Sequence, residues 1–164
     1  MKKLICFVST LVLTITVASA IEKKEPVPSA KLADFKLGEL ITGPAVDFSN
    51  TGGKAVLIEA WGIHCGPCLA SLPDVEKLAK HHKNNLIVVG AHSQDGTNEE
   101  VMSVVKKNKL TYTITKGVHS PISFSGIPRT FVFDTTGQLV FTGSPFDKDF
   151  EKSVTKATHA PAAK

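Results

Sequence analysis

Residues 54–83 read KAVLIEAWGIHCGPCLASLPDVEKLAKHHK. The stretch opens with a short apolar run that ends at Trp61 and follows Gly52-Gly53, which is typical of a strand buried on both faces. From Leu69 to Lys83 the apolar residues recur at helical spacing. The sequence therefore predicts a strand, a turn and a helix, with Cys65 where the helix begins.

Cys65 and Cys68 have the spacing of a pair that cycles between dithiol and disulfide. Unpaired N–H groups and the peptide dipoles at a helix start favour negative charge, and the thiolate is the reactive form of cysteine. We expect Cys65 to attack and Cys68, against the helix body, to resolve the mixed disulfide. Pro67 suits a first helical turn because its missing N–H has no intrahelical partner there, and Gly66 lets a partner chain approach closely.

Half of a zinc site and a purely structural disulfide are the alternatives for this pair. His81 follows Cys68 at the distance that a zinc finger requires, but Asn85, Leu86 and Ile87 occupy the positions of the next histidine. A structural bridge would close a very short loop, for which the stabilisation is smallest. Redox activity without a metal is the favoured interpretation.

Beyond the helix, strands and helices alternate, which predicts a parallel centre for the sheet. Residues 86–91 read as a second buried strand, and Thr97 with Glu100 forms a capping box that opens a helix. We further predict strands at 112–115, 130–134 and 138–142, the last two joined by a tight turn into an antiparallel edge. A final helix is expected from the helical spacing of Phe146, Phe150 and Val154. Before the main unit, short strands are expected around 35–37, 40–41 and 46–48.

The N-terminus has the features of a secretory signal. Lys2-Lys3, an apolar stretch from Leu4 to Val17 and Ala18-Ser19-Ala20 predict cleavage before Ile21. The apolar stretch is short for a membrane span, so tethering by an uncleaved segment is the alternative. We predict a signal peptide at 1–20, a flexible linker at 21–31, one domain at 32–159 and a disordered tail at 160–164.

Cleavage would remove Cys6, leaving Cys65 and Cys68 as the remaining thiols in a compartment where disulfides persist. It would also remove Lys2 and Lys3 and lower the net charge from +4 to +2. A charge this small gives no support to nucleic-acid binding.

Several motifs together resemble those of thioredoxin-fold oxidoreductases. They are WGIHCGPC at 61–68, Pro73, GIPRT at 126–130 and the FVFD strand that follows, in a match that covers residues 35–155. With the export signal, the extra N-terminal strands and the turn at 134–137, the chain is most similar to the extracytoplasmic TlpA/ResA-like branch. The resemblance implies an α/β fold of three layers, with a central mixed sheet flanked by helices.

The resemblance also implies roles for residues near the cysteines. Pro128 would follow a cis peptide bond beside the pair, and the Ile127 backbone would bind an extended substrate; an ordinary trans turn is the alternative. Trp61 would pack beneath the site and shape the substrate surface. His64, which lies where the family often has tryptophan, would tune the Cys65 thiolate, or would be a surface histidine without a special role.

Glu59 is an acidic residue inside an apolar strand, which costs several kcal/mol unless it is neutral or paired. The resemblance makes it the family's buried acid, and a raised pKa would let Glu59 accept the proton of Cys68 during resolution. The alternative is a position at a sheet edge that faces solvent.

The implied activity is that of a thiol-disulfide oxidoreductase whose redox centre is the Cys65/Cys68 disulfide, without a further cofactor or metal. We expect a periplasmic or otherwise extracytoplasmic monomer that reduces disulfides in exported proteins, with apocytochrome c as one candidate, and receives electrons from a membrane thiol reductase. A disulfide-forming oxidant and a copper chaperone that uses the two cysteines and a histidine are the alternatives. A peroxidase of the related redoxin group is disfavoured because Gly62 stands where its threonine would be.

Overall fold

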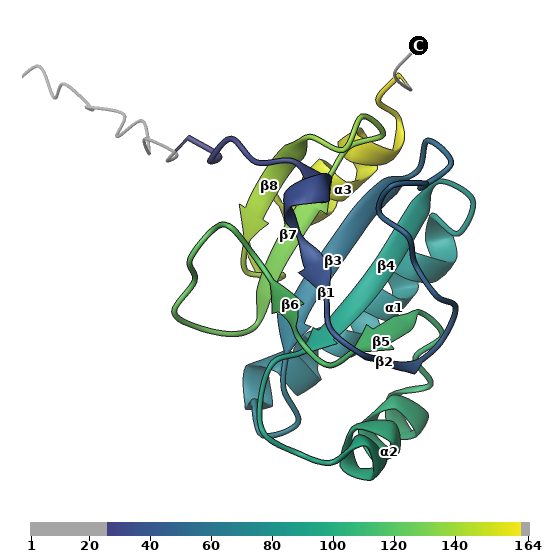
Figure 1. Cartoon of the computed structure of the whole chain (residues 1–164), viewed down its shortest axis with the longest axis vertical. Coiled ribbons are helices and arrows are strands. Elements are labelled where there is room, and N and C mark those ends of the chain that lie inside the picture. The colour runs from purple at the N-terminus through teal and green to yellow at the C-terminus, as the bar shows by residue number, and fades with distance from the viewer. Residues whose placement is uncertain (1–25, 162–164) are drawn as a thin grey trace, which may run out of the picture.

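The computed structural model describes residues 26–161 (Figure 1). The predicted signal peptide, the first residues of the predicted linker and the last three residues of the tail lie outside this range. Within the described part of the chain, no helix combines the length and the hydrophobicity that a membrane span needs.

A mixed sheet of six strands forms the centre of the domain, in the order β2-β5-β4-β3-β7-β8. Strands β3 (Ala55–Trp61), β4 (Leu86–His92) and β5 (Thr113–Thr115) are parallel, which confirms the predicted centre. Strands β7 (Arg129–Phe133) and β8 (Leu139–Gly143) form the predicted antiparallel edge, and β2 (Leu40–Thr42) pairs with β5 in antiparallel orientation.

Three helices pack on one face of this sheet. They are α1 (Gly66–His81), α2 (Asn98–Asn108) and α3 (Phe150–Thr158), and all three contribute to one hydrophobic cluster with Leu57 and Trp61 of β3. The capping box predicted at Thr97 and Glu100 is present at the start of α2. Every residue of β3 is buried, because the strand is central in the sheet and covered on both faces.

The opposite face is covered by the short helix η1 (Leu32–Asp34) and by a two-stranded sheet of β1 (Lys36–Leu37) and β6 (Val118–His119). Phe35, between η1 and β1, packs edge-on against Phe131 and Phe133 of β7. The mixed sheet flanked by helices is therefore as predicted, whereas the pairing of β1 with β6 was not predicted.

Both ends of the described chain are bound at one end of the sheet. The carbonyl oxygen of Ala30 accepts hydrogen bonds from the backbone of Leu139 and the side chain of Gln138. Thr135 lies in the turn between β7 and β8, and its hydroxyl is within hydrogen-bond distance of the carbonyl oxygens of Ala160 and Pro161, so that it can donate to either one. This turn lies at the end of β7 that is farthest from Pro128.

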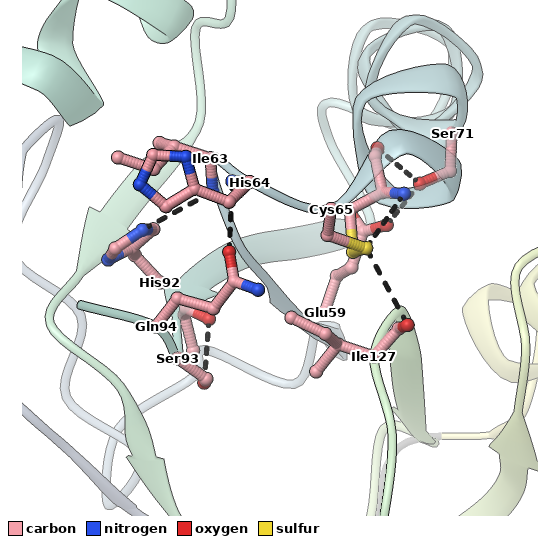
Figure 2. The surroundings of a disulfide bond; sticks show 11 residues. Glu59, Ile63, His64, Cys65, Ser71, His92, Ser93, Gln94 and Ile127 are labelled. Carbon is pink, nitrogen blue, oxygen red and sulfur yellow. Dashed lines mark hydrogen bonds between the residues drawn. A yellow bond between two sulfur atoms is a disulfide. The ribbon is translucent and has the colours of Figure 1, made fainter. Parts of the chain in front are cut away.

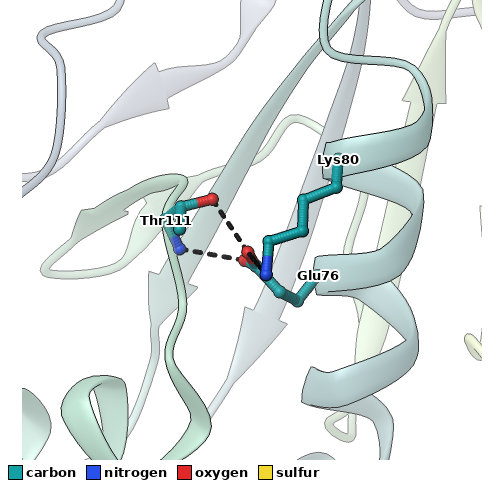
Figure 3. Close-up of polar contacts among 3 residues, drawn as sticks. All are labelled: Glu76, Lys80 and Thr111. Carbon is teal, nitrogen blue, oxygen red and sulfur yellow. Dashed lines mark hydrogen bonds and ion pairs between the residues drawn. The ribbon is translucent and has the colours of Figure 1, made fainter.

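Glu76 binds helix α1 to the segment that leads into β5 (Figure 3). Its nearly buried carboxylate accepts hydrogen bonds from the backbone N–H of Thr111 at 2.9 Å and from the Thr111 hydroxyl at 2.8 Å. Lys80 completes the group, with Nζ 3.0 Å from Oε1 of Glu76.

Two predictions are wrong, namely the strand at 46–48 and the inclusion of Phe146 in the last helix, which otherwise forms as α3. Residues 46–48 are irregular and lead into a turn at 48–49 instead of forming a strand, because the carboxylate of Asp47 accepts hydrogen bonds from the backbone and hydroxyl of Ser49 and so competes with sheet pairing. Phe146 is outside the last helix and 58% exposed. It lies in a turn in which Asp147 accepts from the N–H of Ser144, and α3 begins only at Phe150.

Candidate active site

The cysteines lie where β3 is followed by α1. Cys65 is the N-cap residue of α1, and its Sγ atom accepts a hydrogen bond from the N–H of Cys68 at 3.2 Å. The two cysteines form a disulfide. Cys65 keeps 9% of its surface exposed, whereas Cys68 has none. A partner thiol or disulfide can therefore approach Cys65 and not Cys68.

The segment before Cys65 is held by two side chains at the carboxyl end of the neighbouring strand β4, His92 within the strand and Gln94 just after it (Figure 2). The backbone N–H of His64 donates to Oε1 of Gln94 at 2.9 Å, and the N–H of Ile63 donates to Nε2 of His92 at 3.4 Å. A Cβ atom at Gly62 would overlap the side chain of Gln94, so glycine is needed there for this contact.

His92 must be neutral to accept through Nε2. Burial lowers its pKa, and the charges of His64 and Lys116 lower it further. His92 and Gln94 were not singled out from the sequence. Their position could have been inferred from the sequence, because the carboxyl ends of parallel strands meet at one edge of a sheet. His92 is the last residue of β4, which pairs with β3, and Gln94 follows it by two positions.

Ile127 and Pro128 lie beside Cys65. The peptide bond between them is cis, as the resemblance implied, and the carbonyl oxygen of Ile127 is 3.6 Å from Sγ of Cys65. Strand β7 begins directly afterwards and runs antiparallel to β3, with Arg129 opposite Ala60. This pairing brings the start of β7 to the end of β3 that precedes the cysteines.

Glu59 is fully buried in β3, so the alternative of a solvent-facing edge position is wrong. Its Oε1 atom accepts a hydrogen bond from the hydroxyl of Ser71 at 2.7 Å, and among the described residues Oε2 has no hydrogen-bond partner. Burial raises the pKa of Glu59 to about 7, although the bond from Ser71 lowers it. A carboxyl group with this pKa can both accept and return a proton near neutral pH.

The other predicted site residues divide into exposed and buried. Gly66, Pro67 and His64 are exposed around the disulfide, and nothing lies within 4 Å of the place where a Cβ atom at Gly66 would be. Trp61 is fully buried, with its ring edge-on to that of His92. Direct contact between Trp61 and a substrate, as its predicted part in the substrate surface would require, is therefore not available, and the indole supports the site from below.

Among residues 26–161 there is no group of three or more His, Cys, Asp or Glu side chains arranged to hold a metal ion. His81, considered as a zinc ligand, is at the opposite end of α1 from Cys65. The zinc-finger alternative is therefore incompatible with the fold.

Comparison with known proteins places this site in a family. The sequence matches the Redoxin family over residues 22–158. It is 27% identical over 128 residues to the thioredoxin-like protein YneN of Bacillus subtilis, covering 74% of this chain and 75% of YneN. It is also 27% identical over 104 residues to the thiol-disulfide oxidoreductase ResA of Bacillus cereus, and this match covers 61% of this chain and 60% of ResA.

Solved structures share the fold. A thiol:disulfide interchange protein of Chlorobium tepidum superposes with a TM-score of 0.66 at 21% identity, over 81% of this chain and 99% of that one. A DsbF homologue from Corynebacterium diphtheriae has a TM-score of 0.66 at 22% identity, over 78% of this chain and 87% of that one. A secreted disulfide oxidoreductase of Mycobacterium tuberculosis has a TM-score of 0.60 at 17% identity, over 74% of this chain and 95% of that one. Because the Redoxin family match covers most of its length, the chain belongs to that family, and it is a thioredoxin-fold thiol-disulfide oxidoreductase of the ResA/TlpA type.

Proposed function

We propose that the protein works outside the cytoplasm as a reductant of disulfides in exported proteins, through the dithiol form of Cys65 and Cys68. The observation that carries this proposal is the placement of Cys65. It is the N-cap residue of a long helix, it is the more exposed of the two cysteines, and it faces the Ile127-Pro128 segment, against which an extended substrate could lie.

The reaction starts from the reduced protein. The Cys65 thiolate attacks one sulfur of a substrate disulfide, a mixed disulfide forms, and the other substrate sulfur leaves as a thiolate. Cys68 then gives its proton to the carboxylate of Glu59 and attacks Sγ of Cys65. The second substrate sulfur leaves, and the Cys65–Cys68 disulfide remains. Two electrons have passed from the protein to the substrate.

Glu59 fits the role of proton acceptor because its pKa is raised to about 7, so that carboxylate and acid are both present near neutral pH. Ser71 links the two residues, because its hydroxyl is within hydrogen-bond distance of the Glu59 carboxylate and of the backbone carbonyl oxygen of Cys68.

Export is supported by the signal-like sequence at residues 1–20 and by the likeness to a protein whose structure is described as secreted. In such a compartment the disulfide that remains after each turnover must be reduced again. We assign that step to a membrane thiol reductase. Exported proteins with disulfides are the corresponding substrates, with apocytochrome c before haem attachment as one candidate.

The test is the reduction potential of the Cys65/Cys68 couple together with reduction of insulin disulfides. A potential near about −270 mV with rapid insulin reduction supports the proposal, whereas one near about −120 mV would identify a disulfide-forming oxidant instead. Export is tested by locating the full-length protein in fractionated cells. Recovery from the cytoplasm alone would overturn that part of the proposal.

A further inference from the structure

Ser71 contacts both the buried acid, Glu59, and the backbone of the resolving cysteine, Cys68; Figure 2 shows Ser71 together with Glu59. It is on α1, three residues after Cys68, and is only 1% exposed. Its Oγ atom is 2.7 Å from Oε1 of Glu59 and 2.8 Å from the carbonyl oxygen of Cys68. Both distances are those of hydrogen bonds.

One hydroxyl cannot fill both contacts as a donor at the same time, because it carries a single hydrogen. The carbonyl oxygen of Cys68 can only accept. When Glu59 is a carboxylate it can also only accept, and as the charged acceptor it forms the stronger bond with the Ser71 hydrogen. When Glu59 is protonated on Oε1, the carboxyl group can donate to Oγ, and the Ser71 hydrogen is then available to the carbonyl of Cys68.

We propose that Ser71 is a positioning residue that couples the protonation state of Glu59 to the backbone of Cys68, through a hydroxyl hydrogen that points to the carboxylate in one state and to the carbonyl in the other. This inference rests on the proposed role of Glu59 as the proton acceptor for Cys68. Ser71 itself neither gains nor loses a proton over the cycle. The proton that leaves Cys68 ends on Glu59, and the electron pair of the Cys68 thiolate forms the bond to Sγ of Cys65.

The coupling has a direct effect on the resolution step. The bond from Ser71 stabilises the charged form of Glu59 and so lowers a pKa that burial raises. Without the hydroxyl, burial acts unopposed and the carboxylate becomes scarcer near neutral pH. Cys68 then finds a proton acceptor in a smaller fraction of the molecules.

The other neighbours of Glu59 do not titrate in the same range. Its register partners are Gly90 on β4 and Thr130 on β7, neither of which ionises. Tyr112, just before β5, is buried and its pKa is raised well above the usual value by burial and by the charges of Glu59 and Glu76, so it stays protonated. A change in the protonation of Glu59 would therefore act on Cys68 of α1, by altering how readily its thiol loses a proton during resolution.

The experiment separates attack from resolution with Ellman's reagent, an aromatic disulfide. The reduced protein releases one thionitrobenzoate when Cys65 attacks and a second one when Cys68 resolves the mixed disulfide. We expect Ser71→Ala to leave the first phase in place and to move the midpoint of the pH–rate profile of the second phase upward by about one pH unit. The second phase would then be about five-fold slower near neutral pH.

Two threonine-sized variants form the matched control. Ser71→Thr keeps the hydroxyl and should retain the wild-type midpoint, whereas Ser71→Val has the same shape without the hydroxyl and should show the upward shift. If the alanine variant does not fold, the comparison of threonine with valine carries the same information.

A double variant shows whether Ser71 acts through Glu59. In the background of Glu59→Gln, Ser71→Ala should produce no further shift. The inference is overturned if Ser71→Ala leaves the midpoint unchanged, or if the same shift occurs in both backgrounds. If Glu59→Gln itself leaves the second phase unchanged, the proposed role of Glu59 fails together with this inference. The first phase, which requires only Cys65, reports separately on the proposed reduction of disulfides.

Discussion

The Sγ atom of Cys65 lies 3.6 Å from the carbonyl oxygen of Ile127, although 62 positions of sequence separate the two residues. The contact joins the loop after β3 to the segment before β7, which are neighbours because β3 and β7 pair in the sheet. A substrate that reaches Cys65 therefore meets the Ile127-Pro128 segment at the same time, and the surface that it contacts comes from two distant parts of the chain.

The two cysteines should differ when each is replaced by serine. Cys65→Ser should abolish turnover, because the buried Cys68 cannot reach a substrate disulfide. Cys68→Ser should still attack and should accumulate a mixed disulfide, which mass spectrometry of the intact protein detects. Full activity of Cys65→Ser, or failure of Cys68→Ser to trap a substrate, would contradict these roles.

Glu59 should make the oxidised protein less stable as the pH rises. Its pKa is about 7 in the folded protein against 4.5 for an ordinary glutamate, so between these values the folded state keeps a proton that the unfolded state has lost. The contribution is fully present below about pH 4.5 and should be lost by about pH 7, at a cost of about 3 kcal/mol. Urea unfolding across this range should show the slope in the wild type and a flatter profile in Glu59→Gln. Parallel profiles would show that Glu59 is not the cause.

His92 should accept the hydrogen bond from the N–H of Ile63, in the segment before Cys65, only while the imidazole is neutral. Its pKa is lowered, so the interaction is present above the ordinary histidine pKa of 6.5 and is lost as the pH falls through the lowered value. The protection of the Ile63 amide hydrogen against exchange, measured by NMR relative to the intrinsic rate at each pH, should therefore fall on acidification. His92→Phe, which lacks the acceptor, should exchange rapidly at neutral pH, and His92→Gln should be intermediate. Equal exchange in all three proteins would exclude the interaction.

Two glycines near the cysteines should respond differently to alanine. Gly62→Ala should displace Gln94 and remove its bond to the N–H of His64, which should lower the free energy of unfolding by about 1 kcal/mol. Gly66→Ala is the control, because nothing lies within 4 Å of the new methyl group, and its stability should stay near that of the wild type. Denaturant unfolding of the two variants is the measurement, and equal losses would contradict this interpretation.

Glu76 should contribute far more to stability than Lys80, although the two form one ion pair (Figure 3). Glu76→Ala removes the acceptor for two groups of Thr111 in a nearly buried place and should cost about 2–3 kcal/mol. The side chain of Lys80 is 60% exposed, and Lys80→Ala should cost less than about 1 kcal/mol. Thermal or urea unfolding distinguishes the two, and a larger loss for Lys80→Ala would reverse the assignment.

The parts of the fold that could be predicted are those in which a local pattern and the final environment agree. The apolar run around Glu59 and the helical spacing after Cys68 each continue for several residues, and β3 and α1 formed where they were expected. The capping box at Thr97 is a local motif and was predictable for the same reason. A short strand was expected around 35–37, where β1 forms, whereas β6, with two residues, is too short to show a periodicity and was not predicted.

The site was less predictable because part of it depends on register. Glu59 was identified because an acid stands out in an apolar strand. Ser71, His92 and Gln94 are ordinary residues by themselves and acquire their contacts from the alignment of β4 and α1 with β3. Phe146 had the spacing of a helix, but a turn closed by Asp147 prevents α3 from starting there.

The bonds of Ala30 to Gln138 and Leu139, and of Thr135 to Ala160 and Pro161, determine how the domain can be immobilised or fused. A tag, a surface linker or a second protein joined directly before residue 26 or directly after residue 161 would therefore be attached at the end of the sheet remote from Cys65. Such an attachment would leave the surface around Cys65 accessible to partner proteins.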